Sequence, residues 1–461
     1  MRADGQWLFV DEAGRFFEAS SAFRDRFVAD ALSEADCTFL DKQGHGPAQP
    51  GSLTDLARRR EAARRFATVG PLDYLILVPT LRCNLSCSYC QVSRAALGAS
   101  NFDWTEDTLE RVLALLDSLT TPSIKIEFQG GEATLRLDLV KRVIERCERF
   151  AEREFVICTN LSRIDDDFLA LADRNDVFIS TSLDGDVGTH EAHRTHGAAE
   201  TQAFIDNLDR LLARYGPGKV SALPTVDPDD PPDPDRLIDS YVDRGLHRIF
   251  LRPINYHGFA RKRHRGSVEQ GKAWHDYYLD FVHRLIARNW EDRSRVIEET
   301  YLSLCLRRIF QAGRDRHVDL RNPNPVGVDY IVIDYDGRVY PTDEARMLTR
   351  SRVVDLCIGD LDTGWDTEQR RLLNVHSTNQ FDPQCRKCAY QPFCGRDLID
   401  DLARYGRIDV ARHETAFCRR HMFIFDLLFD LIYSGDPAIA YSLGRWLGLP
   451  GDSAQLAVRA S

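Results

Sequence analysis

Three cysteines in the stretch LRCNLSCSYCQ have the residue type and the spacing of metal ligands. They are Cys83, Cys87 and Cys90, and Tyr89 stands directly before the last of them. A tetrahedral zinc site takes four protein ligands, and a disulfide takes two thiols. Three thiols in one loop therefore predict a metal centre that keeps one coordination position open.

The elements that must position this loop are predicted by apolar runs that alternate with helical patterns. The runs between residues 73 and 253 are DYLILVP, SIKIEF, EFVICT, VFISTSLDG, KVSALPTV and HRIFLRP. Six strands that alternate with helices predict an α/β fold with a parallel sheet, most simply a partial (β/α)6 barrel of the TIM type. The cysteine loop follows the first strand, and such barrels carry their chemistry after the carboxyl ends of the strands.

The motif C-x3-C-x2-C after the first strand, with an aromatic residue before its third cysteine, resembles the radical S-adenosylmethionine (SAM) superfamily. The resemblance implies a [4Fe-4S] cluster on Cys83, Cys87 and Cys90, with SAM chelated by the open iron and Tyr89 near the cofactor. It also implies cleavage of SAM to a 5'-deoxyadenosyl radical that removes a hydrogen atom from the substrate. A zinc knuckle that uses Cys158 or a distant ligand, or three incidental core cysteines, are the alternatives.

A second motif, FQGGEATL, ends the second predicted strand. Gly130 and Gly131 lack side chains, so a ligand can approach the backbone, and Glu132 offers a carboxylate to an ammonium group. In the resembled superfamily this element binds the amino group of SAM. An ordinary turn is the alternative for two glycines and an acid.

Two further segments resemble SAM-binding elements of the peptide-modifying branch of the superfamily. ISTSLDG followed by THEAHRTHG matches its SLDG and H-[DE]-x-x-R patterns. The resemblance places Ser182 and Arg194 at the cofactor, with Glu191 where an aspartate is more usual. Asn160 ends the third strand and is a further candidate for the same pocket.

Four cysteines near the C-terminus form a second possible ligand set, made of Cys385, Cys388, Cys394 and the more distant Cys418. Four thiolates close a zinc site or a fully ligated cluster equally well, so spacing does not choose between them. The pattern C-x2-C-x5-C resembles the SPASM extension of radical enzymes that modify peptides. That extension usually has seven cysteines, so the resemblance implies one auxiliary [4Fe-4S] cluster here rather than two.

The chain departs from the SPASM pattern where the missing ligands are expected. Leu398 stands at one such position, and Thr342 replaces the thiol that normally ends the hairpin YPC. Asp343 follows Thr342, at a place where some relatives hold a catalytic acid or base, and it is the candidate for that role.

The remaining cysteines have no ligand spacing and are expected to be buried or half-buried small side chains. They are Cys37, Cys147, Cys158, Cys305 and Cys357. The first residues carry charges throughout and lack the apolar core of a signal peptide. We therefore expect a cytoplasmic protein whose cysteines are ligands or buried thiols rather than disulfides.

The same patterns predict four parts of the chain. Residues 1–70 form a small α+β module suited to precursor recognition, because a peptide can add a strand to an exposed sheet edge. The radical SAM barrel follows at 71–265, and a helical connection at 266–325. Residues 326–461 form the SPASM-like domain with a helical C-terminus, which begins with a hairpin over 330–341 turning at Asp-Gly.

Charge and hydropathy exclude two classes of partner. A net charge of -11 argues against general binding to nucleic acid, which needs clustered Lys and Arg. The most apolar late segment, residues 422–433, is interrupted by Asp426 and Asp430 and is shorter than a membrane span of roughly 20 residues.

These features predict a radical SAM maturase that removes a hydrogen atom from a ribosomally made precursor peptide or protein side chain. The opening LFVDEAGRFF, the segment LVPTLRCNLSCSYCQVSRA and the reduced C-terminal cysteine set resemble the His-Xaa-Ser system maturases. The resemblance implies a precursor peptide, a flavodoxin- or ferredoxin-type electron donor and a second radical SAM enzyme as partners. A radical SAM enzyme for a small molecule, or a non-catalytic iron–sulfur or zinc protein, are the alternatives.

Overall fold

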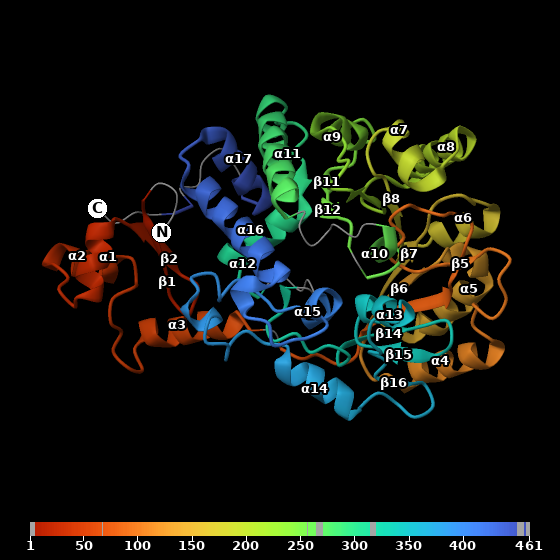
Figure 1. The fold of residues 1–461 in the computed structure, drawn as a ribbon, viewed down its shortest axis with the longest axis horizontal. Helices are drawn as coiled ribbons and strands as arrows, with labels where there is room; N and C mark the ends of the chain where they lie inside the picture. The colour runs from red at the N-terminus through yellow and green to blue at the C-terminus, as the bar shows by residue number, and fades with distance from the viewer. Residues whose placement is uncertain are drawn as a thin grey trace.

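The computed structural model describes residues 5–66, 68–255, 257–263, 271–313, 320–449 and 456–457 of the 461-residue chain. The molecule is elongated, as Figure 1 shows. The N-terminal elements lie at one end, the large sheet lies at the other, and the C-terminal helices fill the space between them.

A central, mostly parallel sheet confirms the predicted α/β fold. Its parallel strands follow one another in the order β3 (Tyr74–Thr80), β6 (Ser123–Gly130), β7 (Glu152–Cys158), β8 (Val177–Ser182) and β9 (Val220–Leu223). The next strands form separate short parallel pairs, β10 (Thr225–Val226) with β12 (Arg252–Pro253) and β11 (Arg248–Ile249) with β13 (Glu298–Glu299). The six-stranded barrel therefore stays a prediction.

The predicted hairpin is confirmed and extends the same sheet. It consists of β14 (Tyr330–Ile333) and β15 (Arg338–Tyr340), joined antiparallel, with β16 (Gly359–Asp360) beside β15. β14 also pairs in parallel with β3, which sequence patterns did not reveal. The hairpin thus shares a sheet with the strand that carries the cysteine loop, and the predicted division at residue 326 stays untested.

Helices between the strands bury one face of the sheet. They are α4 (Glu106–Ser118), α5 (Leu137–Arg146), α6 (Asp166–Ala172), α8 (Ala198–Tyr215) and α9 (Pro234–Val242). Leu75, Leu77, Ile126 and Phe155 alternate along their strands and are fully buried in the resulting core. Burying each such side chain contributes about 1.5–3 kcal/mol.

Shorter elements connect these parts. They are β4 (Arg82–Cys83), β5 (Ala95–Ala96), α7 (Val187–His190), α10 (Ala260–Arg263), the π turn η3 (Glu191–Thr195) and the 3-10 turns η1 (Ala133–Arg136), η2 (Cys147–Arg149), η6 (Cys385–Lys387) and η7 (Arg412–Glu414).

The N-terminal elements have a small core of their own. They are β1 (Trp7–Val10), β2 (Phe16–Ala19), α1 (Ser21–Val28), α2 (Glu34–Lys42) and α3 (Leu53–Arg64). Phe17, Phe23 and Leu40 are buried together there. Helix α2 was not predicted, although Ser33 and Asp36 form a capping box at its start.

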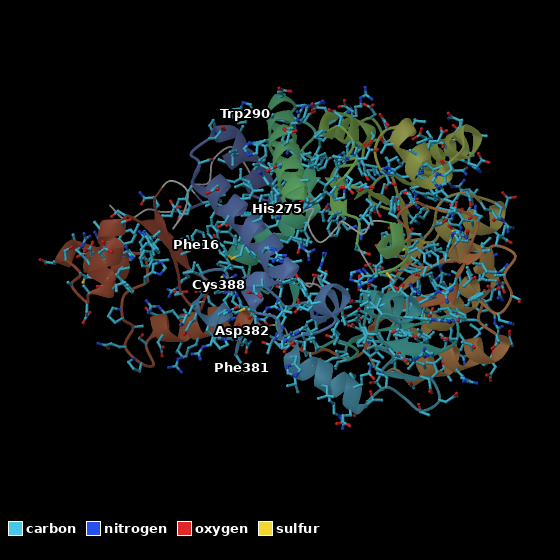
Figure 2. The ribbon with its side chains drawn as sticks, in the orientation of Figure 1. Phe16, His275, Trp290, Phe381, Asp382 and Cys388 are labelled. Atoms are coloured by element: carbon cyan, nitrogen blue, oxygen red, sulfur yellow. The ribbon has the colours of Figure 1, made fainter. Side chains whose placement is uncertain are left out.

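A helical layer joins the two ends of the molecule. Its helices are α11 (Gly271–Glu291), α12 (Thr300–Phe310), α13 (Asp343–Arg350), α14 (Glu368–His376), α15 (Leu398–Tyr405), α16 (Ala416–Tyr433) and α17 (Pro437–Trp446). Across the described residues, none of the helices combines the length and the apolar character needed to cross a membrane. Phe16 of β2 packs edge-on against Phe429 of α16, with ring centroids 5.0 Å apart, and Figure 2 shows it facing this layer.

Arg65, just after α3, joins the N-terminal elements to the same helical layer through polar contacts. Its guanidinium donates to the carbonyl oxygens of Ala13, Arg308 and Ile309, at 3.0 Å for Ala13 and 3.1 Å for Ile309. The guanidinium also lies 5.1 Å from the ring centre of Phe393. Burial, together with the neighbouring charge of Arg308, lowers the pKa of Arg65 to about 10.

We predict that Arg65→Ala loosens the N-terminal elements, because three carbonyl groups lose a charged donor. The cost is about 1–3 kcal/mol of docking free energy. Hydrogen exchange over residues 7–64 measures it, with Arg59→Ala as a control, since Arg59 is 71% exposed and pairs only with Asp55 within α3. Equal protection in both variants contradicts this role.

Candidate functional site

The three-cysteine loop lies at the carboxyl end of β3. Strands β4 and β5 pair in parallel and close the loop, with Cys83 opposite Ala96. Cys83 is buried, Cys87 and Cys90 are half-buried, and the three lie close enough for their charges to interact. Burial raises the pKa of Cys83 to about 12, so a metal that binds there must displace a proton.

Asp103 ties the base of this loop together and was missed by sequence reasoning. Its carboxylate accepts from the hydroxyl of Thr80 at 2.6 Å and from two nitrogens of Arg82 at 2.6 and 2.7 Å. Arg136 approaches it to 3.3 Å. Residues 80 and 82 flank the turn into the loop, so this network fixes the direction in which the thiols leave the strand.

Gly130 and Gly131 meet the loop through their backbone. The amide of Gly131 donates to the carbonyl of Thr80 at 3.0 Å, and that of Glu132 donates to the carbonyl of Arg82 at 2.9 Å. A Cβ on either glycine would come closer than 3.0 Å to backbone carbonyl oxygens of residues 80–82. The φ of Gly130 is +118°, which further favours glycine. A Cβ on Gly130 would also meet the side chain of Val78 at 2.8 Å, so neither position has room for a larger residue.

Glu132 and Asn160 are brought together beside Cys83. Glu132 is 1% exposed, and its carboxylate accepts from the amide of Asn160 at 2.7 Å and from the hydroxyl of Thr134 at 2.7 Å. Burial raises its pKa, against the opposing effect of these donors. The side-chain amide of Asn160 donates to Asn84 at 2.9 Å and lies 3.9 Å from the sulfur of Cys83.

Tyr89 and Arg194 meet at a buried carboxylate. The hydroxyl of Tyr89 donates to Asp184 and accepts from Arg194 at 2.7 Å. Burial opposes the charge of Arg194, but Tyr89, Cys87 and Asp184 raise its pKa. Burial also raises the pKa of Asp184, which is fully buried. Asp184 belongs to the SLDG segment, so its place after a buried strand was the signal that could have identified it.

Ser182 lies half-buried at the carboxyl end of β8, level with Leu223 of β9. This is the same edge of the sheet at which the cysteine loop, Glu132 and Asn160 lie. The sequence-predicted cofactor residues are therefore gathered at one edge, although they come from four strands.

Inward-facing polar side chains continue from this edge along the sheet. Cys158 is enclosed, and its thiol interacts with the charges of Glu127, Asp343, Glu132 and Arg252. Burial raises the pKa of Cys158. Sequence reasoning treated this cysteine as incidental, whereas the fold places it between the candidate cofactor residues and the candidate acid.

Asp343 has a structural partner. Its carboxylate accepts from the fully buried Arg346 at 2.8 Å, and Arg346 also lies 3.7 Å from Asp334. Thr342, at the position of the expected thiol, caps α13 by accepting from the amide of Ala345 at 3.0 Å. The local sequence thus begins a helix where a cluster ligand was expected.

The four late cysteines surround one cavity of about 550 Å³. Their thiols interact electrostatically with one another, and burial raises the pKa of Cys385 to about 12. Cys418 lies in the first turn of α16, where the helix dipole favours a thiolate. Cys388 lies in the central helical part, as Figure 2 shows, far along the molecule from the sheet.

In neither group of cysteines do the thiols already surround a single ion. Among the residues that the structure describes, no three His, Cys, Asp or Glu side chains already form a metal-binding group. The clustered thiols nevertheless have the softness that iron–sulfur clusters require. The expectation that the remaining cysteines are buried or half-buried was wrong for Cys37, which is exposed because it lies on the outer face of α2.

Comparison with known proteins relates the segment that holds the three-cysteine loop to one superfamily. Residues 77–241 match the family model of the Radical SAM superfamily. This superfamily implies a [4Fe-4S] cluster and SAM as cofactors. The matched segment contains the three-cysteine loop, Glu132, Asn160 and Arg194, and it ends within α9.

Solved structures show the same fold. Native anSMEcpe with bound AdoMet is 17% identical, covers 77% of this chain and 97% of its own, and gives a TM-score of 0.61. The same protein with bound AdoMet and Cp18Cys peptide, also 17% identical with the same coverage, gives a TM-score of 0.59.

Curated relatives match more locally. A GTP 3',8-cyclase of Klebsiella pneumoniae subsp. pneumoniae is 28% identical over 142 residues, 30% of this chain and 42% of the relative. An uncharacterized protein of Methanocaldococcus jannaschii is 28% identical over 120 residues, 25% of this chain and 40% of the relative. The chain thus covers about two fifths of these relatives. An uncharacterized protein of Synechocystis sp. is 22% identical over 351 residues, 71% of this chain and 83% of the relative.

We predict that Gly131→Ala displaces the cysteine loop. The added methyl group collides with the carbonyl oxygens of Leu81 and Arg82, and such overpacking costs about 1–3 kcal/mol. Iron bound per chain after oxygen-free reconstitution, together with thermal unfolding, measures the effect.

Gly98→Ala is the matched control, because a Cβ there meets nothing within 4 Å. A Gly131→Ala protein that melts and loads iron like the Gly98→Ala protein would contradict the close backbone approach described above.

Proposed function

We propose that this protein is a radical SAM maturase that acts on a peptide or protein side chain. The observation that carries the proposal is the gathering of Cys83, Cys87 and Cys90 beside Glu132 and Asn160 at one edge of a radical SAM-type sheet. Three thiols in one loop leave one iron of a four-iron cluster open to a cofactor.

The three thiols would hold the [4Fe-4S] cluster, once their protons are displaced. When bound, the cluster and SAM supply a one-electron cleavage that yields methionine and a 5'-deoxyadenosyl radical, which removes a hydrogen atom from the substrate. The chain's own contribution is to orient the loop, through Asp103 at its base and the backbone of Gly131 beside it.

Glu132, Asn160, Ser182 and Arg194 are proposed to bind SAM. Glu132 and Asn160 are held next to Cys83, which supports their place beside an open iron. Arg194 is held by Tyr89, and its positive charge stands near Cys87. A guanidinium at that place suits a carboxylate.

The late cysteines are proposed to hold one auxiliary [4Fe-4S] cluster. Four thiols around one cavity support full ligation by cysteine, with zinc as the other candidate. Asp343 remains a weak candidate for a catalytic acid or base, since Arg346 engages its carboxylate. The carboxylate of Asp343 lies near Cys158, and this supports a position of Asp343 along the interior of the sheet.

A peptide is the proposed substrate because anSMEcpe, which has the same fold, is known with a bound peptide. From the resemblance to the His-Xaa-Ser maturases, the proposed partners are a repeat-bearing precursor, a flavodoxin- or ferredoxin-type electron donor and a second radical SAM enzyme. The local match to GTP 3',8-cyclases favours a second candidate function, a radical reaction on a purine nucleotide. Incubation with GTP and with a neighbouring-gene peptide separates the two.

We predict that Cys87→Ala abolishes formation of 5'-deoxyadenosine under reducing, oxygen-free conditions, because only two ligands of the open cluster remain. Chromatography of the quenched reaction measures it. Cys37→Ala is the control, since this thiol is exposed and far from either ligand set. Equal amounts of 5'-deoxyadenosine from wild type and Cys87→Ala would end the proposal.

We predict a different result for Cys388→Ala. This variant should still cleave SAM, because Cys388 belongs to the other thiol group, but it should lose iron and form little or no modified peptide. Iron analysis and mass spectrometry of the peptide measure both effects. Unchanged iron content together with bound zinc in wild type would contradict the auxiliary cluster.

A further inference from the structure

A cavity of about 1280 Å³ lies at the amino-terminal edge of the sheet, opposite to the cysteine loop. The first residues of β3, β6, β7 and β14 line one side of it. The carboxyl ends of α3 and α12 line the other side. Its volume exceeds the roughly 300–1,000 Å³ of pockets that hold single small ligands.

The described residues that line the cavity carry an excess of positive charge. The cations number seven and are Arg60, Arg64, Arg65, Lys125, Arg153, Arg308 and Arg321. The carboxylates number four and are Asp73, Glu152, Glu154 and Asp329. This excess of three positive charges stands in a chain whose net charge is -11, so the cavity differs in sign from the molecule as a whole.

Two of these carboxylates are already used by cations of the same cavity. Arg321 donates to Asp329 at 3.0 Å, and Lys125 lies 2.8 Å from Glu154. Their charges therefore do not offset those of the α3 arginines.

Arg60 and Arg64 face the cavity from α3, one turn apart. Within the described part of the chain, neither has a carboxylate at ion-pair distance. Arg64 lies in the last turn, where the helix dipole by itself favours a cation. Arg60 lies a turn earlier and is exposed like Arg64, so both charges are open to a ligand from solvent.

The half-buried guanidinium of Arg65 adds to this cationic side. Among the described residues its hydrogen bonds go to carbonyl oxygens, and the charge of Arg308 lowers its pKa while the charges of Glu61 and Asp11 raise it. An anion in the cavity would add to this partial compensation.

A chain of charge interactions links the cavity to the cysteine loop at the other edge of the sheet. Tyr74 lines the cavity and interacts with Glu127 and Cys158, and Cys158 in turn interacts with Glu132. Strand β3 has seven residues, so the cavity and the loop are roughly 20 Å apart along the strand. A ligand bound in the cavity could extend over that distance only if it were a chain.

We propose that this cavity binds an acidic segment of a peptide, whose carboxylates meet Arg60 and Arg64. The proposal rests on the proposed function in taking a peptide as the substrate. The carboxyl ends of α3 and α12 disfavour any anion, so the arginines must carry the binding, and competition with GTP separates a peptide from a nucleotide.

Binding of a fluorescein-labelled octaglutamate peptide to the full, reconstituted chain tests the proposal by fluorescence anisotropy. Arg60→Gln/Arg64→Gln should weaken binding about tenfold, and added salt should weaken wild-type binding further. The control is Arg59→Gln/Arg146→Gln, which removes two charges from exposed ion pairs outside the cavity and should leave the dissociation constant within twofold.

Four outcomes would overturn the proposal. They are no binding to wild type, equal weakening in both double variants, displacement of the peptide by GTP at lower concentration than by unlabelled octaglutamate, and tighter binding of single-stranded DNA. Thermal unfolding of each variant checks that it is folded. Because 5'-deoxyadenosine formation without peptide is measured separately, failure of the radical chemistry and failure of this cavity give different results.

Discussion

The close approach between the carboxyl end of β6 and the cysteine loop is the constraint on which the site depends. The amides of Gly131 and Glu132 bond to carbonyls at Thr80 and Arg82, so the strand end and the loop share one hydrogen-bond network. Only residues without a Cβ permit this distance. Since Glu132 then reaches the amide of Asn160, the same contact sets the places of the third strand and its side chains.

Opposite charges are also held close together beside the cysteine loop. The buried Asp184 and Tyr89 lie together with the half-buried Arg194 next to Cys87, where a low dielectric strengthens each interaction. Removing one member would leave another without compensation, so the arrangement fixes the positive charge of Arg194 in space. In the proposed function, the guanidinium of Arg194 near Cys87 and the carboxylate of Glu132 near Cys83 would bind a zwitterionic ligand in one orientation.

Sequence reasoning identified the parts of the site that depend on local patterns. Unbroken apolar runs predicted the strands. The glycine-rich and SLDG segments come directly after such runs in the chain. Pairing of β14 with β3 was not predictable, because it joins residues about 250 positions apart that share no periodic signal. Asp103 was missed for the same reason, since Thr80 and Arg82, its partners, belong to another segment of the chain. The cavity beside the arginines of α3 was missed because its lining residues come from distant parts of the chain. At Thr342, where the resembled pattern has a thiol, the side chain caps α13 instead.

Electron paramagnetic resonance of oxygen-free, reconstituted and reduced protein tests the central claim most directly. The account predicts a [4Fe-4S]⁺ signal whose shape changes when SAM is added, because SAM binds the open iron held by Cys83, Cys87 and Cys90. A protein without such a signal, or with a signal that SAM leaves unchanged, would contradict it.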